Sequence, residues 1–282
     1  MNMNAKTKQK LRRIIFLGLP LTVFLVFTLA PFYWIVITAL KTSTEVFAKP
    51  LTYWPAQITF ENFLNLFRNL HFERYFINSF IVSISVTLLV SVMALIGGYA
   101  MSRYKFKGKG FVYVLLLCTQ MFPAVVLMIP LFQTMNQLRL INDLRSLIIV
   151  CSCTNLPYCM FMMMGYYNAI PRTLEEAAQV DGCNLLQAVF KILLPAMKPS
   201  IVATGAYAFI NSWNVYVYAT AFITRKEKYT IPLALSIFQG EASTNYGGIA
   251  AACVVALIPA LLLFALIQRN LAGGATSGAV KG

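Results

Sequence analysis

Long runs of apolar residues alternate along the chain with short polar segments. Six stretches contain no Asp, Glu, Lys, Arg or His, and each exceeds the roughly 20 helical residues needed to cross about 30 Å of hydrocarbon. These stretches are residues 14–40, 76–102, 111–138, 146–171, 199–224 and 242–268. One charge at the centre of a span costs roughly 2.5–3.5 kcal/mol, so six charge-free stretches predict six transmembrane helices. With trimmed ends, we place these helices at about 14–40, 76–102, 111–133, 146–168, 200–223 and 246–268.

The predicted fold is therefore an all-α integral membrane domain over residues 14–270. A tail of residues 1–13 precedes it and a tail of residues 271–282 follows it. The first apolar run follows basic residues, as a signal peptide does, but it is far longer than the roughly 7–15 residues of a signal core. We interpret it as a retained first span. The small and glycine-rich C-terminal tail is predicted to be disordered in the isolated chain.

Composition agrees with a lipid environment. The chain is 59% hydrophobic and 11% charged, whereas soluble domains average about a quarter charged residues. The net charge of +14 could indicate nucleic-acid binding. The basic residues, however, lie in short clusters beside the apolar runs, which favours contact with anionic lipid headgroups and no nucleic acid.

The basic residues also predict the orientation of the chain in the membrane. If the N-terminus is cytoplasmic, the cytoplasmic segments hold 14 Lys and Arg residues and the outer loops hold nine. Four of the 14 lie in the short segment 103–109 between two spans. Because basic residues accumulate on the cytoplasmic side, we expect both termini and the segment 171–199 to be cytoplasmic.

The sequence offers little for catalysis. It contains no G-x-x-x-x-G-K-[ST] phosphate loop, no H-E-x-x-H and no G-x-S-x-G, and its one histidine lies outside the apolar runs. Two of the six cysteines form the pair Cys151-x-Cys153, a spacing that points helical side chains apart, so inert buried thiols are expected. Ion-driven transporters keep ionisable relays within their spans. We therefore predict no enzyme, metal or cofactor, and an energy source in a partner.

The cytoplasmic segment 173–195 is unusual because it is polar and small in an otherwise apolar chain. Thr173 and Glu176 have the spacing of a capping box, which predicts that a helix begins there. Gly182 suits the left-handed end of that helix. Asn184 with Gln187 repeats the capping pattern, so two short helices around a glycine are predicted.

The second of these helices is predicted to place Leu185, Val189 and Ile192 near one stripe, and to run as far as Pro195. Helix rules alone leave open a well-capped connector whose acidic residues only solvate it. A rigid two-helix projection on the cytoplasmic face is the other interpretation.

A family resemblance changes this balance. Glu176-Ala177-Ala178, Gly182 and Ile192-x-Leu194-Pro195 follow the spacing E-A-A-x3-G-x9-I-x-L-P, which resembles the EAA loop of ABC importer permeases. Other stretches resemble the carbohydrate branch, the maltose-type G-subunit permeases. These are Asn78-Ser79, YAMSRYKF at 99–106, Pro123 with Pro130, Ile170-Pro171, Ser212-Trp213-Asn214 and GAVKG at 278–282. Cys183 and Val215 depart from the pattern, which usually has alanine and often an acid there.

The resemblance implies a permease subunit of a bacterial ABC importer in the inner (cytoplasmic) membrane. The implied partners are a second homologous permease, an ATPase dimer that binds ATP and Mg²⁺, and an extracytoplasmic solute-binding protein. The implied solute is a carbohydrate, in particular an oligosaccharide. A non-sugar solute and a non-transporting membrane scaffold are the alternatives. The implied ATPase-coupling residues are Glu175, Glu176, Ala177, Ala178, Asp181, Gly182, Ile192, Leu194 and Pro195.

Polar residues within the spans are candidates for the solute pathway. At 100° per residue, Asn211, Asn214 and Tyr218 share one helix face. Amides can bond to sugar hydroxyls, and aromatic rings can cover sugar C–H faces. Hydrogen bonds between helices and an aromatic belt are the structural alternative. The candidates are Gln120, Asn155, Asn211, Trp213, Asn214 and Tyr218.

Overall fold

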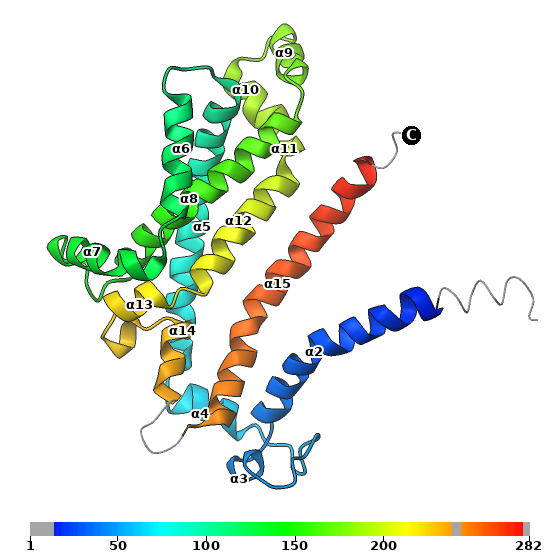
Figure 1. Ribbon diagram of the computed structural model, residues 1–282, viewed down its shortest axis with the longest axis vertical. Coiled ribbons are helices and arrows are strands. Elements are labelled where there is room, and N and C mark those ends of the chain that lie inside the picture. The colour runs from blue at the N-terminus through cyan, green and yellow to red at the C-terminus, as the bar shows by residue number, and fades with distance from the viewer. Residues whose placement is uncertain (1–13, 239–243, 279–282) are drawn as a thin grey trace, which may run out of the picture. The chain divides into compact units, whose positions relative to one another are not determined.

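The computed structural model describes residues 14–238 and 244–278, and every regular element in these ranges is a helix (Figure 1). The chain divides into two compact units, Met1–His71 with Phe238–Val255 and Phe72–Ile237 with Ala256–Gly282. The elements are η1 (Ile14–Gly18), α2 (Leu19–Ala39), α3 (Ser43–Val46), α4 (Glu61–Arg68), α5 (Phe72–Arg103), α6 (Lys109–Gln120), α7 (Ala124–Gln137), α8 (Leu144–Ala169), α9 (Thr173–Val180), α10 (Leu185–Ala188), η2 (Val189–Leu193), α11 (Leu194–Ala196), α12 (Lys198–Trp213), α13 (Val217–Phe222), η3 (Lys226–Lys228), α14 (Ile231–Ala234), η4 (Leu235–Phe238) and α15 (Tyr246–Gly278).

The predicted all-α membrane fold is confirmed. Four stretches of helix are long and apolar enough to cross a bilayer, namely Ile15–Ala39, Phe72–Arg103, Leu144–Ala169 and Tyr246–Gln268. They correspond to the first, second, fourth and sixth predicted spans. Two further pairs of helices pass the same test only together, namely Lys109–Gln120 with Ala124–Gln137 and Leu185–Ala196 with Lys198–Trp213. The described residues therefore contain up to six spans if each bent pair counts as one.

The third predicted span is not one helix. Residues 111–133 were expected to cross continuously, but α6 ends at Gln120 and α7 begins at Ala124, with a bend of 101° between the two axes. Pro123 lies at the break in an extended conformation. Proline has no N–H to donate and disfavours helical backbone at the residue before it, so it ends the first helix and starts the second.

The fifth predicted span, 200–223, is also interrupted. Helix α12 ends at Trp213, and α13 begins only at Val217. The side chains of Asn211, Ser212 and Asn214 all donate to carbonyl oxygens four residues earlier, at 2.6 to 3.0 Å. Such side chains compete with backbone donors for the last carbonyls of a helix, which accounts for its end here.

The last helix is longer than predicted. Helix α15 continues from the sixth span to Gly278, so the backbone of residues 271–278 is helical where a disordered tail was predicted. Extension of an existing helix is easy because each added residue gains one hydrogen bond, whereas nucleation is costly. Residues 1–13 and 279–282, which include the remaining predicted tail, lie outside the described residues.

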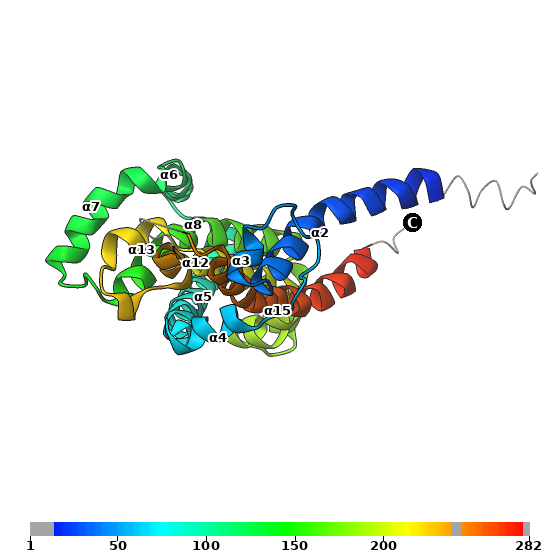
Figure 2. The same ribbon diagram turned by 90° about the horizontal axis from the view of Figure 1, so that it is seen from below.

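The core of the larger unit is formed by α5, α8 and α12, which lie side by side (Figures 1 and 2). Val82, Val86, Val90 and Ala94 are fully buried at intervals of four residues along α5. That spacing places them on one helix face, which packs against α8 along most of its length. The single face explains why α5 can be apolar all round and still have a defined packing surface.

Close approach of α5 and α8 depends on a glycine. A Cβ atom added at Gly98 would lie 2.7 Å from Cβ of Met163 and 3.0 Å from the backbone nitrogen of Met164. Both neighbouring atoms belong to α8 and cannot rotate away. Small residues at such contacts are the usual means by which helices pack tightly in a membrane.

The smaller unit is held by side-chain bonds to backbone carbonyls. The amide of Asn62 donates to the carbonyl oxygens of Ala39 and Lys41, each at 2.9 Å. Lys41 is buried, and its ammonium donates to the Thr52 carbonyl and lies 5.1 Å from the centre of the Trp34 ring. These contacts close the segment that follows the first span.

We predict that Gly98→Ala destabilises the protein because its methyl group would overlap α8. Overpacking of this kind costs about 1–3 kcal/mol, measurable as a lower melting temperature of the purified protein in detergent. Gly165→Ala on α8 is the matched control, since an added Cβ there meets nothing within 4 Å. Equal melting temperatures for the two variants would contradict the close-packing interpretation.

Candidate functional site

The segment 171–199 forms the predicted two short helices around a glycine. Helix α9 is followed by a turn at Gly182, and α10, η2 and α11 then continue to Ala196. Gly182 has φ of +88°, a left-handed conformation that side-chain-bearing residues rarely adopt. A Cβ there would meet nothing within 4 Å, so the backbone angle alone is the reason for glycine.

One of the two predicted helix caps is present and the other is not. Asn184 accepts from the Gln187 amide while the Gln187 side chain accepts from the Asn184 amide, each at 2.9 Å, so the capping box at the second helix is confirmed. The capping box predicted at Thr173 is wrong. Thr173 is already helical, and Arg172 occupies the cap position with no side-chain cap bond.

The second helix buries a different stripe from the predicted one. Leu185 is exposed, while Ala188, Leu193 and Met197 are buried. Residues Val189–Leu193 form a π-helical turn, which places more residues in a turn than an α-helix does. The extra residue rotates the following side chains, so a stripe calculated for a regular α-helix does not apply. Ile192 and Leu194 are half-buried and Pro195 is exposed.

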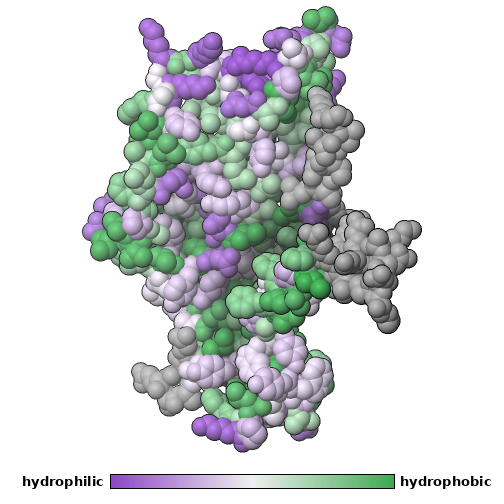
Figure 3. All heavy atoms as spheres, turned by 45° about the vertical axis from the view of Figure 1, so that its right-hand side comes forward, coloured by the Kyte–Doolittle hydropathy of each residue, from purple (hydrophilic) through white to green (hydrophobic). Residues whose placement is uncertain are grey.

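The two faces of α9 have different environments. Glu175 and Ala178 are buried, whereas Glu176, Ala177 and the C-terminal cap residue Asp181 are exposed. Large apolar side chains are also exposed on this segment, with Val180 at 87%, Leu186 at 67% and Phe190 at 64%. Hydrophilic side chains gather over the end of the molecule where α9 and α10 lie (Figure 3). Exposed apolar residues at a polar end are typical of a contact surface for another protein.

The buried face of α9 is tied to the end of α5 by an ion pair. Nε of Arg103 donates to Oε1 of Glu175 at 2.5 Å, and both side chains are less than one-tenth exposed. The Tyr99 hydroxyl donates to the other carboxylate oxygen at 3.0 Å. Arg103 also donates to the Ile170 carbonyl at 3.1 Å. Glu175 is therefore fully bonded inside the protein, and Glu176 is the glutamate that faces outward.

A second arginine connects the start of α9 back to the end of α5. Arg172, which precedes α9, donates to the carbonyl oxygens of Ser102 and Arg103 at 3.3 and 3.1 Å. The last carbonyls of a helix lack partners within it, and this guanidinium supplies one. The Ser102 hydroxyl donates to the Asn168 side chain on α8 at 2.6 Å. Three elements, α5, α8 and α9, therefore meet through polar bonds.

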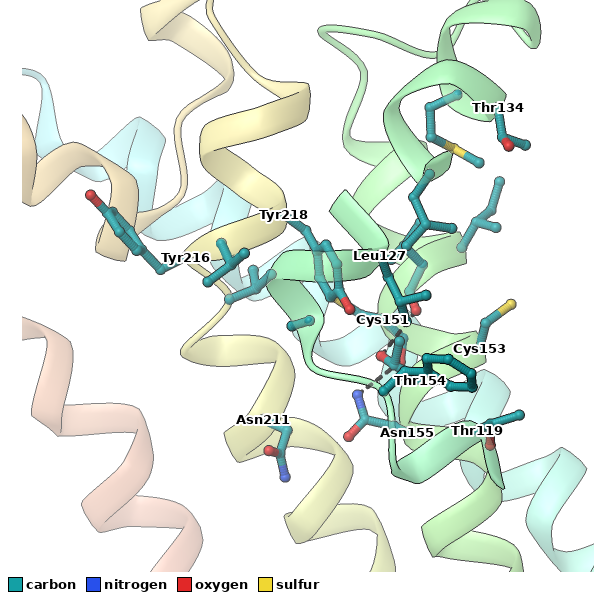
Figure 4. A pocket seen from close by; sticks show the side chains of 18 of the residues that line it. Thr119, Leu127, Thr134, Cys151, Cys153, Thr154, Asn155, Asn211, Tyr216 and Tyr218 are labelled. Carbon is teal, nitrogen blue, oxygen red and sulfur yellow. Dashed lines mark hydrogen bonds between the residues drawn. The ribbon is translucent and has the colours of Figure 1, made fainter. Parts of the chain in front are cut away.

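A separate cavity of about 760 Å³ lies between α6, α7, α8, α12 and α13. Four of the predicted pathway residues line it, namely Gln120, Asn155, Asn211 and Tyr218. Figure 4 shows Asn155, Asn211 and Tyr218 among the side chains that line the cavity, each carried by a different helix. Within the part of the chain that the structure describes, its lining contains no acidic, basic or histidine residue.

The other two pathway candidates lie outside this lining. Trp213 is buried, its ring stacks on Phe209 with centroids 5.5 Å apart, and its Nε1 donates to the Ala256 carbonyl at 3.2 Å. The indole bond therefore joins the end of α12 to Ala256 of α15. Asn214 is exposed and bonds to the Ile210 carbonyl.

Residue-by-residue reasoning did not identify the role of Arg103 or the burial of Glu175. Arg103 counted only as one of the cytoplasmic basic residues, and its partner is 72 positions away in the sequence. No local signal marks this pairing, because Arg172, three residues before Glu175, was an equally available basic partner.

The chain belongs to the family described as the binding-protein-dependent transport system inner membrane component, whose model matches residues 93–276. It is therefore a multi-pass permease subunit of an ABC importer of the inner membrane, a transport component and no enzyme. The matched region includes both the segment 171–199 and the whole cavity lining.

Two relatives match along almost their full length. The chain is 34% identical to a diacetylchitobiose uptake system permease protein of Streptomyces coelicolor, over 89% of this chain and 91% of the relative. It is 30% identical to an arabinooligosaccharides transport system permease protein of Halalkalibacterium halodurans, over 99% and 100%.

Solved structures share the fold. A chain of a bacterial ABC transporter that imports the acidic polysaccharide alginate has a TM-score of 0.77 and 21% identity, covering 95% of this chain and 99% of that one. This likeness shows that the chain has the same overall fold as that transporter chain.

Proposed function

We propose that this permease subunit translocates an uncharged carbohydrate, in particular an oligosaccharide. The cavity carries the proposal. Its volume of about 760 Å³ lies within the roughly 300–1,000 Å³ of small-molecule sites, and its polar groups are amides, hydroxyls and tyrosines. Such groups bond to sugar hydroxyls without supplying charge. The two relatives above, both named for saccharides, support the same solute class.

We further propose that an ATPase dimer supplies the energy, with ATP and Mg²⁺ bound by that partner. The outward face of the coupling segment supports this. Glu176, Ala177 and the exposed Val180, Leu186 and Phe190 present small, apolar and acidic groups to another protein. A second permease subunit and an extracytoplasmic solute-binding protein complete the proposed importer.

The proposed orientation places both termini and the segment 171–199 in the cytoplasm. Hydrogen bonds between distant segments agree with this orientation, because they join segments that are predicted to lie on the same side of the membrane. The 103–109 segment and α9 lie at the same end, because Arg103 bonds to Glu175. The predicted outer segments are joined as well, since Asn142 accepts from the Thr224 amide at 2.7 Å and Asn78 donates to the Glu227 carbonyl at 2.9 Å.

The solute class can be tested with the assembled importer. The chain would be co-purified with the proposed second permease and ATPase, placed in nanodiscs and mixed with the proposed solute-binding protein. We expect a neutral oligosaccharide to stimulate ATP hydrolysis several-fold, because a loaded binding protein signals through the permease. Stimulation by an amino acid or an anionic glycan alone would contradict the proposal.

The cavity can be tested with two matched asparagines. Asn211 and Asn214 are both exposed and both bond to a carbonyl four residues earlier, but only Asn211 lines the cavity. We expect Asn211→Ala to weaken solute-stimulated transport roughly 2- to 10-fold, the value of one hydrogen bond. Asn214→Ala should transport like wild type. The reverse order of effects would exclude this cavity from the pathway.

Orientation can be tested with an impermeant thiol reagent in a chain whose exposed and half-buried cysteines are replaced by serine, namely Cys118, Cys153, Cys183 and Cys253. We expect a cysteine at Glu227 to be labelled in intact cells, and a cysteine at Lys107 only after permeabilisation. Both positions are exposed. Labelling of Lys107→Cys in intact cells would invert the proposed orientation and would move the ATPase to the other side.

A further inference from the structure

The polar contacts between α5 and α9 form a reciprocal clasp, defined here as Arg103, Glu175, Arg172 and Tyr99. Arg103 reaches from the end of α5 to the buried face of α9. Arg172 reaches from the start of α9 back to the last carbonyls of α5. Tyr99, one turn before Arg103, bonds to the same carboxylate. Each helix end thus holds the other.

The clasp also includes α8. A second guanidinium nitrogen of Arg103, Nη2, donates to the carbonyl of Ile170, the residue at the C-terminal cap of α8. Ser102 bonds to Asn168 within the last turn of α8. Beyond this end, α5 and α8 pack against each other along most of their length, with Gly98 in close contact with Met163. The clasp therefore joins α9 to the tightest helix pair of the unit.

An ion pair buried at this junction is stiffer than an exposed one. Both side chains are less than one-tenth exposed, so water neither screens the charges nor replaces a broken bond. Separation of Arg103 from Glu175 would leave two buried charges without an opposite charge beside them, although each keeps one neutral hydrogen-bond partner. Small displacements of α9 are therefore carried by α5 and α8, because bending at the junction is the costly alternative.

We infer that Glu175 and Arg103 are positioning residues for coupling: they make α9 move with α5 and α8 as one body. This inference rests on the proposed docking of the ATPase at the coupling segment. Glu176 and its exposed neighbours would receive the movement, and Glu175 would pass it to the spans. The two adjacent glutamates thus have different tasks, which follow from the helix faces that they occupy.

The clasp could instead serve folding alone. In that case its loss would lower assembly, ATP hydrolysis and solute uptake in proportion. A coupling role predicts a split, because the ATPase could still close on the outward face of α9 while the spans no longer follow. The ratio of solute taken up to ATP hydrolysed separates the two.

The test uses the complete importer in proteoliposomes. We expect Glu175→Gln to leave ATP hydrolysis within about twofold of wild type and to lower uptake per ATP about tenfold. The charge exchange Glu175→Arg with Arg103→Glu should restore part of that ratio. Asp143→Asn is the matched control, since it removes the charge of a half-buried carboxylate 2.7 Å from the exposed Arg145 and asparagine can still cap α8. An unchanged uptake ratio in Glu175→Gln, or a proportional loss of all three quantities, would overturn the inference.

A second measurement does not depend on the solute. Spin labels at Lys105 and Val180, both exposed, would report the distance between the end of α5 and the end of α9. We expect ATP to leave this distance unchanged in wild type and to broaden the distribution of distances in Glu175→Gln. A wild-type complex that transports no sugar but keeps this rigid distance would reject the proposed solute class alone. A wild-type distance that changes with ATP would reject the clasp alone.

Discussion

The absence of water in the hydrocarbon core is the constraint on which this structure depends. Every backbone N–H and C=O group at that depth needs a partner within the protein, so spans are helical and their interruptions must be buried or face a cavity. Both interruptions here meet that condition. Phe122 lies in the break between α6 and α7, Val215 and Tyr216 lie in the break between α12 and α13, and all three line the same cavity. The irregular backbone of both spans therefore borders the proposed solute site.

The same constraint explains why specific packing falls to a few positions. Between helices in lipid there is little hydrophobic driving force, so close contact and polar bonds decide which helices associate. In α5 the close contact is at Gly98 and the polar bonds are at its two ends, where Asn78 meets the Glu227 carbonyl and Arg103 meets Glu175. Helix α5 thus connects the segment around Glu227 to the segment 171–199 as one continuous element.

Local signals in the sequence were sufficient for much of this architecture. Charge-free runs predicted the spans, and Gly182 and Asn184 predicted the turn and the second cap, because each depends only on neighbouring residues. The cap at Thr173 was predicted wrongly because Arg172, held by α5, starts the helix one residue earlier. Pro123 was a visible signal of the broken third span. The end of α12, by contrast, depends on three side chains that each donate to a carbonyl oxygen four residues earlier. Contacts such as that of Arg103 with Glu175 join distant positions, and no local pattern specifies them.

Helix α9, in the segment 171–199, has two faces with different environments. Successive residues on a helix differ by 100°, so Glu175 and Glu176 cannot face the same environment. The first is enclosed with Arg103 and Tyr99, and the second faces outward beside Ala177. In the proposed importer, a partner that binds the outer face would move the spans through this inner contact as well as through the chain itself. The stiffness of the inner contact would then set how much of the movement reaches α5. Because Asn155 belongs to α8, the same movement would reach the lining of the cavity.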